Sequence, residues 1–420
     1  MPLSRRCHGT VITFIFSVLL GNFAQADTHA THLHDPLAID TSLTLGEVVD
    51  AAVDAFPEKP VLEARRDQAE AWSRRGRSLT ADRPALMLRY QSDRFGSDTG
   101  LDEYEAGIEL PLWSWGGRSA VKALGSAMTA ESEAARTALR WEVAGMVRAA
   151  LWDVAIAENE HELAEQSLDM AKRLVKTVER RYELGDVAQR DLLLARSSYL
   201  DYETALIQAG AVLLDAERSY RTFTGLHRRP GFEAETMSDA EEIAANHPAL
   251  ALADMAVERA EAGAEVTRQT SKAGPTVLLG TRRERPAFGT VFDDSIGVTV
   301  NVPFGGRAHR DTEITAAART ASEVRAARSR ELRMLTLDMH EAAHSLAVAR
   351  ENYAAASQRL DIAERHQAMG ELAYEKGEIE LLDLLKIRET AIAARRLVAR
   401  LEIEEKRQTA LYNQAVGDLP

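Results

Sequence analysis

The most constraining feature of this sequence is a short alternating segment that leads directly into a very long helical pattern. From Ser295 to Val302, apolar residues alternate with polar residues or glycine, which is typical of a β-strand with one apolar and one polar face. Pro303 ends the alternation, and a helical pattern begins after Gly305-Gly306. A similar alternating segment ends earlier, at Pro111. We therefore expect a mostly α, α+β fold in which strands continue into long helices.

The helical patterns are longer than those of ordinary globular helices. The stretch from Arg118 to about Tyr182 contains no proline. It would form a helix roughly 96 Å long at 1.5 Å per residue. Gly185 then favours a stop, and a shorter helical pattern follows. Apolar residues recur at intervals of three or four, as in the seam of a packed helix: Leu139, Val143, Val147, Leu151 and Val154. These features predict long antiparallel helical hairpins.

Five landmarks of the first half recur in the second half after 191 or 192 residues. The pairs are Pro57 and Pro248, Pro84 and Pro275, Pro111 and Pro303, Gly185 and Gly377, and Asp191 and Asp383. This near-constant offset indicates an internal two-fold repeat. Its period is far above that of the common solenoid repeats.

The landmarks also predict the organisation of the chain. We expect a signal peptide at 1–26, a loose N-terminal segment at 27–44, a first repeat at 45–226, a linker at 227–240 and a second repeat at 241–420. We expect strands at about 84–93, 102–111, 275–284 and 294–303, and turns between helices at 184–186 and 376–378.

The N-terminus has the pattern of an export signal. Arg5 and Arg6 precede a short apolar run, and Ala24-Gln25-Ala26 fits a cleavage site. The single cysteine, Cys7, lies within this signal, so the mature chain would contain no disulfide. The formal net charge of −14 argues against a nucleic-acid partner, because phosphate binding requires clustered Lys and Arg.

The expected strands are about 9–11 residues long, as in tilted membrane-spanning strands. Their two faces suit a water-filled lumen and outer-membrane lipid. Four strands cannot close a barrel by themselves, and open sheet edges are not tolerated in lipid. Closure therefore requires several copies with cyclic symmetry. Three copies with four strands each would form a 12-stranded barrel.

Aromatic residues occur where the expected strands end. Trp113, Trp115 and Phe304 stand at these positions, where aromatic side chains anchor barrels at the membrane interface. Glu105 and Glu109 alternate with apolar residues and are expected to face the lumen, because a charge in lipid is costly.

In combination, these patterns resemble the outer-membrane efflux tunnels of the TolC type. The resemblance rests on the duplicated plan and on Leu110-Pro111-Leu112-Trp113 with Val302-Pro303-Phe304. It also rests on Tyr-x-x-Gly followed by Asp-Leu-Leu, at 182–193 and again at 374–385. The resemblance implies a homotrimer with a 12-stranded outer-membrane barrel and a periplasmic helical tunnel. It further implies a periplasmic adaptor (membrane fusion protein), an inner-membrane pump, no enzymatic activity and no cofactor.

The resemblance also assigns roles to the two turns. The adaptor-docking tips would comprise Leu184, Gly185, Asp186, Lys376 and Gly377. Asp383 would lie near the pore constriction, with Glu378, Glu380 and Asp191 as further candidates. The family often has a second acid one turn after the first, and Lys386 occupies that position here. A double acidic ring is therefore not expected at this site.

Histidines provide candidate metal ligands with weaker support. His340-Glu341-Ala342-Ala343-His344 matches the H-E-x-x-H pattern, in which two histidines bind zinc and the glutamate activates water. The corresponding positions of the first half, Arg148–Trp152, contain no histidine. His29, His32 and His34 form a second candidate group in a polar segment.

The main interpretation is a passive outer-membrane channel of a three-part efflux or secretion system. Its length and Gly-Gly-Arg turns are similar to the heavy-metal-cation branch of the family, so metal cations are the favoured cargo. Organic toxicants and a secreted polypeptide remain open. One alternative is a soluble periplasmic coiled-coil adaptor. A second is an exported zinc peptidase using His340, Glu341 and His344.

Overall fold

The structure is a computed structural model that describes residues 36–420, apart from the side chains of Arg307 and His309. The predicted signal peptide and the group His29, His32 and His34 lie outside the described residues. Among the described residues, helix dominates, and the longest strands form one four-stranded sheet.

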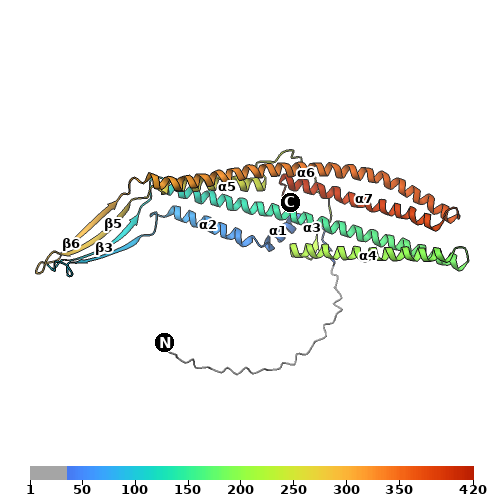
Figure 1. Cartoon of the computed structure of the whole chain (residues 1–420), viewed down its shortest axis with the longest axis horizontal. Coiled ribbons are helices and arrows are strands. Elements are labelled where there is room, and N and C mark those ends of the chain that lie inside the picture. The colour runs from blue at the N-terminus through green and yellow to red at the C-terminus, as the bar shows by residue number, and fades with distance from the viewer. Residues whose placement is uncertain (1–35) are drawn as a thin grey trace, which may run out of the picture. The chain divides into compact units, whose positions relative to one another are not determined.

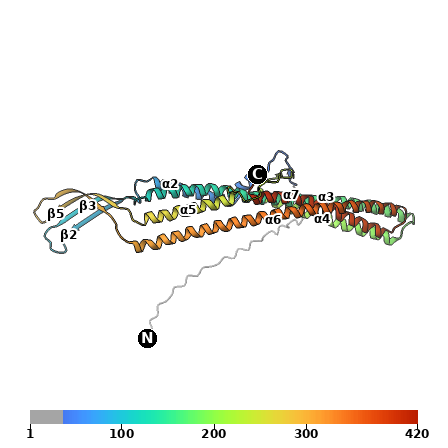
Figure 2. The same cartoon turned by 90° about the horizontal axis from the view of Figure 1, so that it is seen from above.

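The helices form two long hairpins. In the first half, α1 (Leu45–Ala55) and α2 (Lys59–Arg77) precede the sheet strands, and α3 (Gly117–Glu183) and α4 (Gln189–Thr224) follow them. In the second half, α5 (Pro248–Thr270) precedes the strands, and α6 (Arg307–Glu375) and α7 (Leu381–Val416) follow them. Helices α3 and α6 contain 67 and 69 residues. Within Leu37–Pro420, both hairpin turns lie at the end opposite the sheet (Figures 1 and 2).

The four-stranded sheet joins both halves of the chain. Its strands are β2 (Ala85–Ser92), β3 (Asp102–Pro111), β5 (Thr276–Arg285) and β6 (Asp293–Asn301), in the order β2-β3-β5-β6. All neighbouring strands are antiparallel, and the central β3–β5 pair connects the two halves. Strand β6 ends at Asn301, before Val302 and Pro303. Asn301 pairs with Thr276, the first residue of β5, so β5 has no strand residue that could pair with Val302.

A core at mid-length holds α1 against the first hairpin. The seam residues Leu139, Val143, Val147, Leu151 and Val154 are all buried there. They pack with Val48, Val49 and Ala52 of α1 and with Tyr220 of α4. The capping box between Thr44 and Glu47 fixes the start of α1 and therefore positions its apolar face toward this core.

The segment expected to be loose, 27–44, is instead ordered over its described C-terminal part. Strand β1 (Ala38–Ile39) pairs in parallel with β4 (Arg228–Arg229), which lies in the expected linker. Leu37 is buried, and its backbone N–H donates to Glu217 Oε1 at 3.2 Å. The expectation of a loose segment is therefore wrong for these residues, because hydrogen bonds to a distant part of the chain hold them in place.

A buried arginine fastens the linker to the helices. Arg148 of α3 is 2% exposed and donates to both carboxylate oxygens of Glu235 at 2.9 and 2.8 Å. It also donates to the side chain of Gln414 and to the carbonyl oxygen of Asp418, near the C-terminus. The linker thus ties α3 to the end of α7.

Among the helices of residues 36–420, none is both long and apolar enough to cross a bilayer.

Candidate channel wall and tip turns

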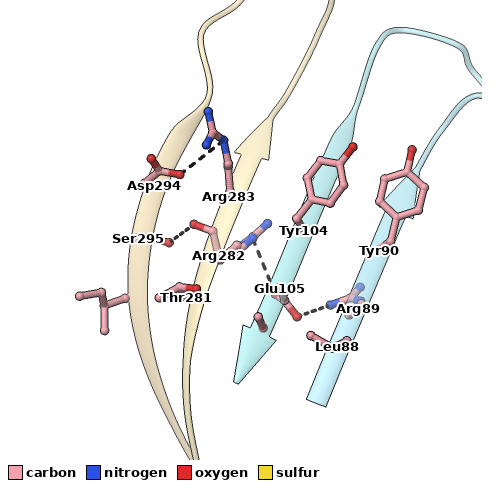
Figure 3. Close-up of a pocket in the computed structure, with 12 residues that line it drawn as sticks. Leu88, Arg89, Tyr90, Tyr104, Glu105, Thr281, Arg282, Arg283, Asp294 and Ser295 are labelled. Atoms are coloured by element: carbon pink, nitrogen blue, oxygen red, sulfur yellow. Dashed lines mark hydrogen bonds and ion pairs between the residues drawn. The ribbon is translucent and has the colours of Figure 1, made fainter. Parts of the chain in front are cut away.

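Charged side chains form a ladder across one face of the sheet. Arg89 on β2 donates to Glu105 on β3 at 3.3 Å, and Arg282 on β5 donates to Glu103 on β3 at 3.0 Å. Arg282 also lies 3.8 Å from Glu105, so Glu105 lies between two arginines (Figure 3). A hollow of about 840 Å³ is lined by residues of all four strands, most of which belong to the other face of the sheet, such as Leu88, Tyr104 and Ile296.

The opposite face of the sheet is apolar and exposed. The register places Ile296 opposite Thr281 and Val298 opposite Leu279. The exposed side chains of this face include Leu86, Leu88, Ile108, Leu279, Ile296, Val298 and Val300. On β3, Glu103 of the charged face is 5% exposed, whereas Tyr104 of the apolar face is 48% exposed. Arg89 and Arg282 lie 3.7 and 3.0 Å from Glu103, which accounts for its burial.

The three expected interface aromatics differ in their surroundings. Trp115 and Phe304 are 96% and 98% exposed at the junction between strands and helices. Trp113 is half-buried, and its indole Nε1–H donates to the carbonyl oxygen of Ser78 at 3.1 Å. The side chains of Trp115 and Phe304 are therefore free to contact a surface outside this chain. The side chain of Trp113 makes a polar contact within the chain.

The two hairpin turns have the same geometry. Gly185 and Gly377 have φ values of +78° and +74°, in the left-handed region that glycine adopts without a Cβ clash. Each glycine and the residue after it donate backbone N–H groups to the last turn of the preceding helix, which is a Schellman motif. Leu184, just before the first glycine, is 70% exposed. Both turns therefore present short, rigid tips.

A shared apolar cluster holds the two tips side by side. Its buried members are Leu174, Val178, Leu192 and Ala195 from the first hairpin and Tyr374, Leu381 and Leu384 from the second. The guanidinium of Arg181 lies 5.0 Å from the centre of the Tyr374 ring, which adds a cation–π contact. The two tips of one chain therefore pack as a unit.

The candidate constriction acids gather around these tips. Glu378, Glu380 and Asp383 are exposed, and Asp191 is half-buried in the first turn of α4. Arg190 lies 3.5 Å from Glu380 and 3.4 Å from Asp191, so one cation contacts acids of both turns. The sequence analysis did not single out Arg190. A difference between the two halves of the sequence could have identified it, because the equivalent residue 192 positions later is Leu382.

The H-E-x-x-H motif lies on the long helix α6, and His340, Glu341 and His344 are all exposed. Residues 36–420 contain no group of three or more His, Cys, Asp or Glu side chains arranged to hold a metal ion. In the first half, the corresponding Arg148–Trp152 region faces inward, and Arg148 binds Glu235. The two halves therefore use these positions differently.

Comparisons with known proteins identify relatives of this chain. Residues 62–226 match the family model described as outer membrane efflux protein. The cobalt-zinc-cadmium resistance protein CzcC of Cupriavidus metallidurans is 25% identical over 325 residues, covering 74% of this chain and 75% of the relative.

Solved structures share the fold. The outer membrane protein VceC of Vibrio cholerae has a TM-score of 0.69 at 16% identity, over 89% of this chain and 96% of VceC. The MtrE outer membrane channel of Neisseria gonorrhoeae has a TM-score of 0.70 at 15% identity, over 89% of each chain. These matches confirm the resemblance seen in the sequence: residues 62–226 fit the family model of outer membrane efflux proteins, and the fold is that of the VceC and MtrE structures.

Proposed function

We propose that this protein is the outer-membrane exit duct of a three-part efflux system and works as a homotrimer. The observation that carries the proposal is the open four-stranded sheet, whose edge strands β2 and β6 each pair on one side only within residues 36–420. The exposed apolar face suits contact with lipid, and a sheet within lipid needs every strand edge paired. Three copies joined β6 to β2 would satisfy both requirements with a 12-stranded barrel.

The internal repeat supports this assembly. The same order of helix, strand, strand, long helix and shorter helix occurs in each half. Two similar halves in each of three chains would distribute six similar units around one axis. The charged sheet face would then line the lumen, and the apolar face would contact outer-membrane lipid. Trp115 and Phe304 would anchor the barrel at the interface.

The tips would serve docking and gating. Leu184, Gly185, Asp186, Lys376 and Gly377 would contact a periplasmic adaptor, which in turn binds an inner-membrane pump. Asp383 would form a ring of three carboxylates at the constriction, with Glu378, Glu380 and Asp191 nearby. Such a ring would favour cations, because fixed negative charge raises the local cation concentration. The channel itself would be passive and would carry out no catalysis.

Metal cations are the favoured cargo. The relative CzcC is named for resistance to cobalt, zinc and cadmium. The chain has a formal net charge of −14, and acids outnumber bases on the charged sheet face. A negatively charged duct would attract metal cations and raise their local concentration, whereas a positively charged duct would exclude them.

Membrane fractionation with chemical crosslinking tests the channel proposal. We expect the mature chain, cleaved after Ala26, in the outer-membrane fraction, with crosslinked species up to the trimer. A monomer in the soluble fraction would overturn the barrel and would favour the periplasmic adaptor alternative. Glu341→Gln should leave the export of substrate from the cell unchanged. Loss of a peptidase activity in that variant would support the zinc peptidase alternative.

Resistance assays in cells test the cargo. A strain that lacks this protein should lose resistance to cobalt, zinc or cadmium and regain it with the wild-type chain. Asp383→Asn should restore resistance only in part, whereas Asp361→Asn, an exposed acid of α6 with an i+4 ion pair, should restore it fully. Sensitivity to organic toxicants alone would reject metal cations as the cargo.

A further inference from the structure

The exposed side of α6 carries two histidines one turn apart, opposite its packed side. Met339 and Leu346 of α6 are buried against Tyr412 and Val416 of α7. At 100° per residue, the side chains of His340 and His344 lie about 40° apart and point away from that contact. Both imidazoles are exposed.

Nothing within the described part of the chain competes for these imidazoles. Among residues 36–420, the side chains of His340 and His344 form no hydrogen bond and no ion pair. The backbone between them is the uninterrupted helix α6, so their separation is set in advance. The pair is therefore free to bind an ion and is geometrically preorganised.

We propose that His340 and His344 form a two-imidazole site for a divalent transition-metal ion. Two histidines at positions i and i+4 on one helix face present their ring nitrogens to a common point, as in helical zinc motifs. Imidazole suits Cu(II), Ni(II) and Zn(II), and affinity should be highest for Cu(II). This site differs from the peptidase reading, because it needs no third protein ligand and no role for Glu341.

The small number of protein ligands determines how the site behaves. A closed structural zinc site has four protein ligands, whereas this pair leaves the remaining positions to water. The ion should therefore bind weakly and exchange quickly. Such a site suits transient binding of cations that pass along the protein, and it does not suit long-term metal storage. Metal binding by the pair stands by itself, and only its role in transit rests on the proposed efflux of metal cations.

Titration of the purified full-length protein with Cu(II), followed by calorimetry and electron paramagnetic resonance, tests the site. We expect His340→Ala and His344→Ala each to bind one ion per chain fewer than the wild type and to lose the nitrogen coupling of that ion. His366→Ala is the matched control, because His366 is also exposed on α6 but has Ile362 and Gly370 one turn away. This control should keep the signal. The site is defined by this difference, so any binding by His29, His32 or His34 does not obscure it.

A change of register sharpens the test. In His344→Ala combined with Ser345→His, the second imidazole moves to i+5 and points to another face, so binding should stay lost. In His344→Ala combined with Ala343→His, it moves to i+3 and binding should return in part. Circular dichroism should show unchanged helix content in every variant.

Two results would overturn the proposal. One is binding by His340→Ala that equals the wild type, and the other is an equal loss in His366→Ala. Neither result would affect the channel assignment, which is tested by fractionation and crosslinking. Conversely, a failure of the metal-resistance assay would leave the measured binding intact.

Discussion

At the residue scale, the stability of the mid-length region depends on a charge that water hardly reaches. Arg148 is 2% exposed, and its partner Glu235 is partly buried. Arg148→Ala would leave that carboxylate without its main partner, which costs about 3 kcal/mol in buried pairs. We expect a clear drop in the midpoint of thermal unfolding in detergent.

The control for this prediction is an exposed arginine on the same helix. Arg173 pairs with Asp169 at 3.6 Å in water-exposed geometry. Arg173→Ala should therefore change stability by less than about 1 kcal/mol. Similar midpoints for the Arg148 and Arg173 variants would contradict the importance of the buried pair.

A second residue makes stability depend on pH. Burial lowers the pKa of His247, whose Nδ1 accepts the Ala249 backbone N–H at 3.2 Å at the start of α5. Because the folded state favours the neutral ring, the unfolded state binds the proton more readily. This stability is present above the unfolded pKa of about 6.5 and is lost as the pH falls through the lower folded pKa.

We expect His247→Asn to retain the helix cap and to lose this pH dependence, since Asn caps helices well and does not titrate. Unfolding midpoints measured from pH 7.5 to pH 5 should fall less steeply in the variant than in the wild type. Parallel curves for the two proteins would show that His247 does not contribute.

At the scale of single elements, strand β6 has two faces with opposite requirements. Val300 lies opposite Val277 on the apolar face, and Thr299 lies opposite Leu278 on the other face. Val300→Arg would place a charge in lipid at a cost of about 2–4 kcal/mol near the midplane. Thr299→Arg would point into the lumen at little cost. We expect the heat-resistant trimer in outer-membrane extracts to decrease strongly for the first variant only.

The two β6 variants are each other's control, because they add the same side chain at neighbouring positions. Equal loss of trimer would mean that the apolar face does not contact lipid. The faces of β6 could be read from alternation alone, but its end could not. That end depends on where β5 begins.

At the scale of the whole molecule, an exposed leucine lies toward each end of the described chain. Leu184 is 70% exposed at the tip, and Leu79 is 84% exposed between α2 and β2. Burying a leucine in an interface contributes about 1.5–3 kcal/mol. Leu184→Asp should therefore weaken adaptor binding about 10-fold to 100-fold.

Pull-down and titration with the purified adaptor would measure this effect. Leu79→Asp should bind the adaptor as the wild type does, and both variants should remain trimeric. Unchanged binding by Leu184→Asp would mean that the adaptor docks elsewhere on the chain.

The sequence by itself determined the features that depend on near neighbours. Alternation defined the strand faces, three-to-four spacing defined the seam of α3, and Gly185 and Gly377 marked the turns. Each of these signals is complete within a few residues, because backbone geometry and turn chemistry are local.

Only the tertiary structure decided which distant segments meet. The β3–β5 pair, the β1–β4 pair, the burial of Arg148 and the Arg190–Glu380 contact all join residues that are far apart in the chain. A short segment such as Ala38–Ile39 carries too little local pattern to reveal its partner. Pairing over such distances depends on how the helices pack, because packing decides which backbone groups come close enough for hydrogen bonds.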